Sequence, residues 1–270
     1  MSKGIFTAVS GAVAQTAQLD TIANNIANVN TPAFKKDSQI FREYLSAYEK
    51  EPNVIPVPRI PASIESFYDM QGGDKSYVDI KGTHTDFTQG SVKQTGNKLD
   101  IAIEGEGFLE VLTPEGLRWT RDGALKVDAE GRLVTKQGFL VMKDGGQGQD
   151  PATRAIKVNS ANLTFSSNGE IFDGAENLGK LAVVQFGNKD SLMKTGLSMF
   201  GLRDNQEPEM TVAQEFQIHQ GAIESSNVNA IQEMTNMIST SRVFESTQKA
   251  IQAYDQMAAK LVHDVPRLKG

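Results

Sequence analysis

The sequence predicts an α+β protein in which the N- and C-terminal helices form one discontinuous coiled-coil or helical domain and the centre forms an all-β domain. Three observations predict this class. Apolar residues recur at helical spacing at both ends, short segments with glycine turns fill the middle, and prolines gather between the first helix and the strands. We expect residues 1–35 with 225–270 to form the terminal helical assembly domain, 36–90 an extended proline-rich connector, and 91–224 the β domain.

The composition excludes several functions before any motif is considered. The 270 residues include no cysteine, so disulfides, thiolate metal sites and cysteine nucleophiles are excluded. The net charge of −6, with no basic block larger than 267–269, argues against nucleic acid as a partner. No stretch approaches the roughly 18 apolar residues of a membrane span, and the first residues lack the apolar core of a cleaved signal, so we expect neither.

The first 30 residues have the pattern of a helix with a narrow apolar stripe. The residues spaced alternately by four and three are Ile5, Val9, Ala12, Thr16, Leu19, Ala23 and Ile26. This spacing is a heptad seam, weakened by its small and polar members. Ile22, Ile26 and Val29 line a second face at the end of the helix. Such a helix is marginal alone and needs partners to bury its stripe.

The last 45 residues predict a second and longer helix. No glycine or proline occurs from residue 225 to 265, which allows a helix of about 35 residues, or roughly 50 Å at 1.5 Å per residue. We expect Ser225 or Ser226 to cap its start. A wide apolar sector comprises Met234, Met237, Ser241, Phe244, Gln248, Ile251, Tyr254, Ala258 and Leu261, with Val243, Ala250 and Met257 beside it.

The segment that follows the first helix predicts a stiff connector. Four of the nine prolines, Pro52, Pro56, Pro58 and Pro61, fall within ten residues. Because proline fixes φ and favours extended chain, this stretch is expected to be semi-rigid.

The middle of the chain predicts short strands joined by tight turns. Leu99, Ile101 and Ile103 alternate with polar residues, as in a strand with one buried face. Turn signals recur at Asp122-Gly123, Glu130-Gly131, Gln137-Gly138 and Asn168-Gly169. We therefore expect a sandwich or barrel-like domain over roughly 90–210.

The sequence carries no convincing catalytic, cofactor or metal motif. His84, His219 and His263 lack metal-ligand spacing, and the "KDGGQGQD" stretch at 143–150 is best explained as a loop. In "RWTRDG" we expect Trp119 in the core and its neighbouring arginines on the opposite strand face. A glycan hydrolase that uses Glu104 and Glu106 stays as an alternative, although adjacent acids at glycine-rich turns are usually solvated. We expect no cofactor.

Four asparagines, Asn24, Asn25, Asn28 and Asn30, crowd the end of the first helix. Capping of the helix end accounts for one or two of them. The others form an amide stripe that can hydrogen-bond to adjacent helices without charge. Contacts between subunits and capping within one chain both remain open.

Both ends of the chain resemble bacterial flagellar rod and hook proteins. "LDTIANNIANVNTPAFKKD" (19–37) is similar to the N-terminal signature of that family, and "ESSNVNAIQEMTNMISTSRVFESTQKAIQAYDQM" (224–257) to its C-terminal motif. "LDIAIEGEGFLEV", "WTRDGALKVDAEGRLVTKQGFLV" and "GKLAVVQFGNKDSLMKTG" resemble its central region. One departure is Ala33, where the family commonly has glycine. Alanine there is strained if φ is positive, or else the turn keeps φ negative.

The resemblance implies a structural subunit of the rod, the drive shaft of the flagellar basal body, and no enzyme. It implies export through the flagellar type III apparatus without a cleaved signal peptide. It also implies helical polymerisation in the periplasm with copies of itself and other rod proteins, with the terminal helices innermost. "TPEGLRWTRDG" and "GKLAVVQF" favour the proximal over the distal rod, and both stay open.

The residues that we expect at the assembly interface belong to the two terminal helices and the segments that flank them. Order gained on assembly would bury their apolar side chains. A β-domain binding module with coiled-coil ends, which forms a discrete oligomer, is the alternative outside the family. The expected interface residues are Ile5, Val9, Leu19, Ile22, Asn24, Asn25, Ile26, Asn28, Asn30, Ser226, Asn227, Asn229, Met234, Met237, Phe244, Ile251, Tyr254 and Leu261.

Overall fold

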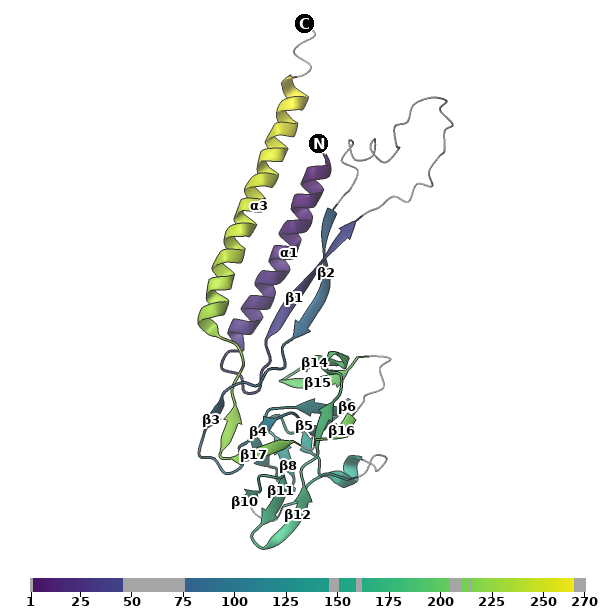
Figure 1. Ribbon diagram of the computed structural model, residues 1–270, viewed down its shortest axis with the longest axis vertical. Helices are drawn as coiled ribbons and strands as arrows, with labels where there is room; N and C mark the ends of the chain where they lie inside the picture. The colour runs from purple at the N-terminus through teal and green to yellow at the C-terminus, as the bar shows by residue number, and fades with distance from the viewer. Residues whose placement is uncertain are drawn as a thin grey trace, which may run out of the picture. The chain divides into compact units, whose positions relative to one another are not determined.

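The computed structural model describes residues 2–45, 76–145, 151–158, 162–203, 210–213 and 215–264 (Figure 1). A long helix stands at each end of the chain, with strands between them, so the predicted α+β class is confirmed. The helices are α1 (Ser2–Ala27) and α3 (Ala230–Asp264), as both terminal patterns predict. The proline cluster at 52–61 lies outside the described residues.

The strands are short except for the first two. In chain order they are β1 (Asp37–Leu45), β2 (Ser76–Thr85), β3 (Val92–Gln94), β4 (Ile101–Gly105), β5 (Phe108–Thr113), β6 (Gly116–Thr120), β7 (Leu125–Val127), β8 (Leu133–Thr135), β9 (Leu140–Val141), β10 (Leu163–Phe165), β11 (Glu170–Asp173), β12 (Glu176–Lys180), β13 (Val183–Phe186), β14 (Leu192–Gly196), β15 (Met199–Leu202), β16 (Met210–Val212), β17 (Phe216–Gln220) and β18 (Ala222–Glu224).

The chain divides into two compact units. The helical unit comprises the described parts of Met1–Ala23, Ser38–His84 and Met234–Gly270. The β unit comprises those of Asn24–Asp37 and Thr85–Glu233. The last turn of α1 and the first turn of α3 therefore belong to the β unit.

Within the helical unit, α1 and α3 run in opposite directions beside each other (Figure 1). A Cβ built on Gly4 would come within 3.4 Å of the Tyr254 ring, so glycine permits a close approach of the two helices. β1 and β2 form a two-stranded sheet within the range predicted as connector. The backbone N–H of Val78 in β2 donates to Ser10 Oγ of α1 at 3.4 Å.

The β unit is built from antiparallel sheets. Its largest sheet has nine strands along the path β14-β15-β6-β5-β9-β8-β7, with β13 and β16 attached at β5. Separate ladders join β10-β11-β12, β17-β4 and β18-β3. None of these sheets closes into a barrel over the strands that the structure describes. Three of the predicted turns join antiparallel neighbours, at Glu130-Gly131, Gln137-Gly138 and Asn168-Gly169, where φ of Gly169 is +91°. Asp122-Gly123 lies between β6 and β7, which do not pair with each other.

Two apolar clusters fill the β unit. The larger contains aliphatic side chains from most of the sheets, among them Ile103, Leu109 and Leu133. The smaller is aromatic and contains Phe108, Trp119, Phe186, Leu192 and Phe200. The rings of Trp119 and Phe186 meet edge to face at 5.1 Å, a favourable geometry for aromatic pairs.

Two local expectations are wrong. The cap of α3 is Asn229, whose Oδ1 accepts from the N–H groups of Ile231 (3.1 Å) and Gln232 (3.2 Å), and not Ser225 or Ser226. Trp119 is buried as expected, but Arg121 is buried as well, 5.5 Å from the Phe108 ring centroid. Strand β6 ends at Thr120, so the alternation of side chains no longer governs Arg121.

Candidate assembly faces and the buried junction

One face of α1 presents apolar side chains to solvent. Phe6, Val9 and Val13 are 59%, 40% and 56% exposed. Their i, i+3, i+7 spacing places them in one row, the α1 stripe, while Ala14 and Ile22 are buried on another face. Residues 4–19 carry no charged side chain. The α1 stripe is therefore an uncharged apolar surface that nothing within the described chain covers.

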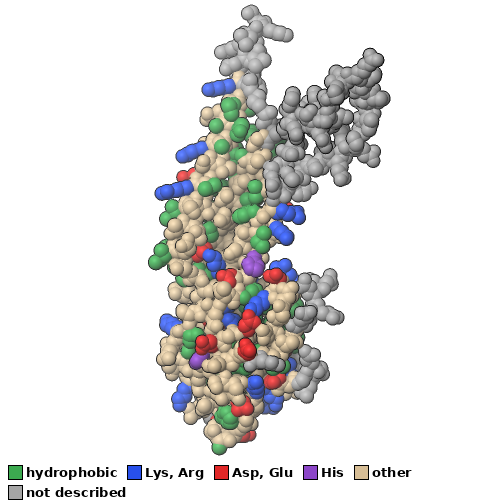
Figure 2. Space-filling view, in the orientation of Figure 1, with side chains coloured by type: hydrophobic (Ala, Val, Ile, Leu, Met, Phe, Trp, Pro, Cys, Tyr) green, Lys and Arg blue, Asp and Glu red, His purple; other side chains and the backbone are tan. Residues whose placement is uncertain are grey.

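The start of α3 carries a similar row. Ile231, Met234 and Ile238 are 78%, 52% and 56% exposed and repeat the i, i+3, i+7 spacing. We call these three residues the α3 patch. Further along the helix, Val243, Tyr254 and Met257 are also exposed. Figure 2 shows hydrophobic side chains spread over the surface of the helices.

The predicted apolar interface residues fall into two groups. Ile22 is buried, and Ile5, Leu19, Ile26, Met237, Phe244 and Ile251 are half-buried. Val9, Met234 and Tyr254 are exposed, whereas the side chain of Leu261 lies outside the described structure.

The heptad seam of the first helix is mixed, with four half-buried residues, whereas Val9, Thr16 and Ala23 are exposed. Phe6, Val13, Ile231 and Ile238 are exposed apolar residues outside the predicted set, and a search for a second i, i+3, i+7 row in the sequence finds them.

The asparagines at the end of α1 differ in their surroundings. Asn25 is buried, donates through Nδ2 to Asp37 O at 2.8 Å, and accepts at Oδ1 from Asp37 N at 3.0 Å. Asn28 caps locally, donating to Asn24 O at 2.9 Å. Asn24 and Asn30 are exposed. Contacts of these amides with another subunit stay a prediction.

Three predicted residues precede α3. Ser226 Oγ accepts from Val228 N at 3.2 Å, and Asn229 caps the helix. Asn227 uses both ends of its amide within the chain. Its Oδ1 accepts from Lys36 N at 2.7 Å, and its Nδ2 donates to Asp86 O at 2.9 Å and to Thr88 O at 3.2 Å.

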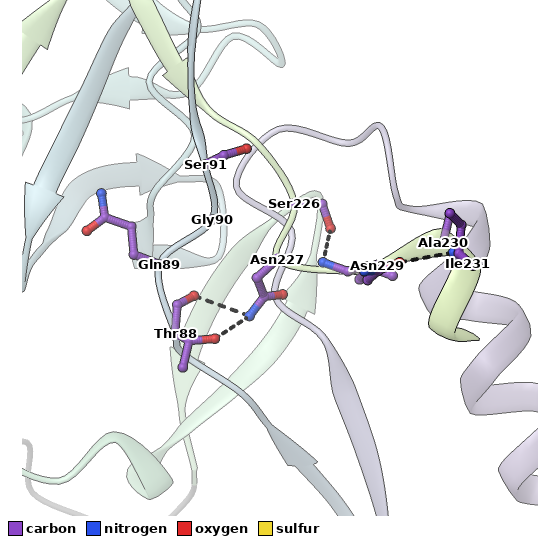
Figure 3. Close-up of a pocket in the computed structure, with 10 residues that line it drawn as sticks. Thr88, Gln89, Gly90, Ser91, Ser226, Asn227, Asn229, Ala230 and Ile231 are labelled. Atoms are coloured by element: carbon purple, nitrogen blue, oxygen red, sulfur yellow. Dashed lines mark hydrogen bonds between the residues drawn. The ribbon is translucent and has the colours of Figure 1, made fainter. Parts of the chain in front are cut away.

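A groove of about 570 Å³ runs beside this segment (Figure 3). Residues 88–91 line one side of it, and residues 226–231 line the other. Figure 3 shows the Asn227 amide directed at Thr88, and Asn229 directed at the first turn of α3. Ile231, the first residue of the α3 patch, is among the residues that line this groove.

A buried ion cluster lies in the β unit. Lys35 Nζ is 2.6 Å from Glu224 Oε1, and neither side chain is exposed. The other carboxylate oxygen of Glu224 lies 3.4 Å from Arg121 Nη1. Arg121 also donates to Gly107 O at 2.9 Å and to Gly105 O. Burial lowers the pKa of Lys35 and of Arg121, and the nearby Glu224 carboxylate opposes both shifts.

A second ionic group surrounds the end of the loop that follows α1. Lys36 Nζ is 2.7 Å from Glu233 Oε1. Lys194 Nζ is 2.7 Å from Asp37 Oδ2 and 4.0 Å from the centroid of the Phe34 ring, in cation–π geometry. The loop after α1 therefore contacts Lys194 of the β14–β15 hairpin and Glu233 in the first turn of α3.

Ala33 occupies the left-handed region, with φ of +54°, and is completely buried. Of the two alternatives for this turn, the strained one is therefore present. Its N–H donates to Glu224 O at 2.9 Å, which explains why the conformation is held despite the Cβ.

The surroundings of the other candidate groups are ordinary for a protein surface. His219 Nε2 lies 2.5 Å from Glu104 Oε2, and Glu106 pairs with Lys189 at 2.8 Å. The two glutamates are exposed, and His219 and Lys189 are half-exposed. No group of three acids or histidines in the described residues is placed to hold a metal ion. Asp150 and the side chain of His263 lie outside the described structure. Among the described helices, none is long and apolar enough to cross a membrane.

Three family models match the chain. They are the flagella basal body rod protein model over residues 5–35, the flagellar hook protein FlgE/F/G D1 domain over 102–172, and the flagellar basal body rod FlgEFG protein C-terminal model over 219–262. Together they cover nearly all of α1 and α3, and the part of the β unit from residue 102 to 172.

Curated relatives match along almost the whole length. The flagellar basal-body rod protein FlgG of Borreliella burgdorferi is 32% identical over 95% of this chain and 96% of its own. The flagellar basal-body rod protein FlgF of Caulobacter vibrioides is 29% identical over 99% of this chain and 100% of its own. FlgG of Buchnera aphidicola subsp. Acyrthosiphon pisum is 29% identical over 97% of this chain and 99% of its own.

A β unit between two long helices with open apolar faces defines a structural, assembly-forming class of protein. The chain belongs to the family of flagellar basal-body rod proteins. It is a structural subunit of the rod and not an enzyme, so the hydrolase alternative is set aside.

Proposed function

We propose that the chain polymerises into the rod through its terminal helices and transmits torque as part of that shaft. The observation that carries the proposal is the matched pair of uncharged rows, the α1 stripe and the α3 patch. A row on one copy that meets a different row on the next makes a heterologous contact, which extends into a helical filament when it does not close. Exposed apolar rows of this kind mark interaction sites.

The predicted interface residues take different parts in this proposal. Val9, Met234 and Tyr254 are exposed and are available to a neighbour. Asn24, Asn30 and Asn229 supply exposed amide groups at the ends of the two helices. The half-buried residues pack within the subunit first. Partners in the rod are further copies of this chain and other rod proteins.

The remaining features of the proposal follow from the family resemblance. In this proposal the chain comprises a terminal helical assembly domain (1–35 with 225–270), a connector (36–90) and a β domain (91–224). The chain reaches the periplasmic rod through the flagellar type III export apparatus without a cleaved signal peptide. Its helices gain order on assembly.

Cysteine cross-linking tests the helical interface directly, because the chain has no cysteine of its own. The double variant Val13→Cys/Ile238→Cys places one cysteine in each row, and the double variant Val13→Cys/Ala129→Cys, in which Ala129 is exposed in the turn between β7 and β8, is the matched control. Basal bodies from cells that express either double variant are treated with a short bismaleimide. A Val13–Ile238 product with ladders of higher oligomers is expected, and the control should give little.

Two results contradict this interface. A single discrete dimer or trimer in place of a ladder would favour a binding module, and unlinked helix cysteines in intact rods would place the contact elsewhere.

The position within the rod is proximal in this proposal, supported by the central motifs, with the distal rod as the alternative. Relatives named FlgF and FlgG both match over almost the full length. Electron microscopy of basal bodies from a strain lacking this chain separates them. If the missing subunit is proximal, the rod should stop at its proximal part and carry no distal part. If it is distal, a short proximal rod should remain.

A further inference from the structure

The junction between the long helices and the strands is held by contacts that lie entirely within the β unit. Residues 24–37 carry the last turn of α1 and the loop after it, and residues 224–233 carry the end of β18 and the first turn of α3. We call these two segments the collar. α1 therefore ends in the β unit and α3 begins there, while most of the length of each helix belongs to the helical unit.

The last turn of α1 is fixed by side-chain and backbone bonds. Asn25 exchanges two hydrogen bonds with the backbone of Asp37, and Asn28 N donates to Asn24 O at 3.2 Å. Asn25 Nδ2 also lies 3.4 Å from Glu233 Oε2. The two helix ends thus share a buried asparagine and a buried carboxylate.

The first turn of α3 is fixed in the same way. Asn229 caps it, and Glu233 N donates to Asn229 O at 3.0 Å. Glu233 is 1% exposed and pairs with Lys36, so an acid stands in the first turn, where the helix dipole favours it. Before the helix, Asn227 bonds to the backbone of Lys36 and of Asp86.

The buried ion cluster connects the two segments of the collar. Glu224 belongs to one segment and Lys35 to the other, and Arg121 joins them from the sheet. Glu224 Oε1 also accepts from Gly90 N at 2.9 Å, and Lys35 donates to Thr88 O at 2.8 Å. Removing one partner of such a buried pair leaves an uncompensated charge, so the cluster couples the stability of the two segments.

We propose that the collar is a preformed nucleus for both terminal helices in the unassembled subunit. The first turn of a helix is the costly one, with a nucleation constant on the order of 10⁻³, and later residues add easily. A collar that fixes one turn of each helix removes that cost, so both helices grow from the β unit outwards when neighbours bury their rows. The use in assembly rests on the proposed function, whereas the nucleus itself is a property of the monomer.

Hydrogen–deuterium exchange of the unassembled full-length chain tests the nucleus. We expect the amides of Asn28 and Glu233 to exchange about 100-fold slower than those of Phe6 and Lys249. Lys35→Met should lower protection at both Asn28 and Glu233 by about tenfold or more, although the two residues belong to different helices. The matched control is Arg132→Met, which removes ion pairs of a half-exposed arginine in the same unit and should leave both unchanged.

Lys35→Met could unfold the β unit as a whole. The amide of Leu133, which donates to Ile156 O within the β unit, would then lose its protection from exchange. In that case Lys36→Met provides the test. This variant removes only the pair with Glu233, so protection at Glu233 should fall several-fold with Leu133 unchanged.

Equal protection along the whole of both helices overturns the proposal. The proposal is also overturned if the amides of Asn28 and Glu233 both lack protection from exchange, or if Lys35→Met lowers protection in only one of the two helices. None of these readouts depends on polymerisation, so a failed cross-linking experiment and a failed nucleus are distinguishable.

Discussion

Lys35 and Glu224, which are 189 residues apart in the chain, form a 2.6 Å ion pair with no exposed surface on either side chain. The pair joins the loop after α1 to the last strand before α3. A hydrogen bond from Ala33 N to Glu224 O, at 2.9 Å, runs beside it. The segment that follows α1 and the strand that precedes α3 thus meet in one buried site of the β unit.

Replacing Lys35 by methionine should lower the free energy of unfolding of the β unit by about 3–5 kcal/mol, because Glu224 keeps a buried charge with a weaker partner. Lys35→Met with Glu224→Gln should lose clearly less than the sum of the single changes. Urea unfolding followed by Trp119 fluorescence measures the cycle. Additive losses would show that the two groups do not interact.

Asn227→Asp should lower the free energy of unfolding by about 1–3 kcal/mol, because the Nδ2 donor is lost. The negative charge of the new carboxylate beside two carbonyl oxygens should lower it further. The new carboxylate cannot donate to Asp86 O and Thr88 O. Asn229→Asp is the matched control, since aspartate is as good an N-cap as asparagine. Thermal unfolding of both proteins makes the comparison, and equal losses would contradict the roles assigned to the two amides.

Ala33→Val should lower the free energy of unfolding by about 2–4 kcal/mol, because a β-branched residue at φ of +54° is strained and the larger side chain enters a completely buried site. Ala33→Gly should stay within about 1 kcal/mol of the wild type, since relief of strain opposes the loss of a buried methyl group and the entropy of glycine. Urea midpoints of both variants test this prediction. A valine that is tolerated would mean that the turn adopts negative φ.

The pKa of Asp122 is raised, chiefly by burial, while the N–H of Ala124 opposes the shift by donating to its carboxylate at 3.1 Å. Between the unfolded and the raised folded pKa, the native state holds a proton that the unfolded state has lost. Stability from this group therefore falls as pH rises through that window and stays lower above it.

Asp122→Asn should consequently raise the free energy of unfolding at pH 7. Its advantage over the wild type should shrink as pH falls through the raised pKa of Asp122. Denaturant unfolding of both proteins from pH 7 to pH 4 measures the difference. An advantage that is constant or grows towards acid would contradict a buried, charged Asp122.

Val13→Asp should leave the free energy of unfolding of the monomer within about 0.5 kcal/mol, because Val13 is 56% exposed. Assembly should fail, since the α1 stripe then carries a charge that no neighbour in an apolar contact compensates. Motility and the yield of basal bodies report the loss. Normal rods with this variant would remove the α1 stripe from the interface.

The sequence by itself determined the elements. Helical spacing of apolar residues and the absence of glycine and proline from 225 to 265 predicted a helix of about 35 residues in the C-terminal segment, and α3 has 35 residues. Glycine turns such as Asn168-Gly169 predicted the hairpins. These properties depend on neighbours a few residues apart, which the sequence displays directly. The terminal motifs were also sufficient to indicate the family.

Tertiary structure alone decided which residues pair across the chain and which helix faces stay open. The helical spacing of the sequence places Leu19 and Phe244 among the expected contacts between subunits. In the folded chain both are half-buried, whereas Phe6 and Ile231 are exposed. Nothing local marks Lys35 and Glu224 as partners, because their pairing depends on where two distant segments meet in the β unit. Local spacing defines a face, and only the folded chain fixes what that face contacts.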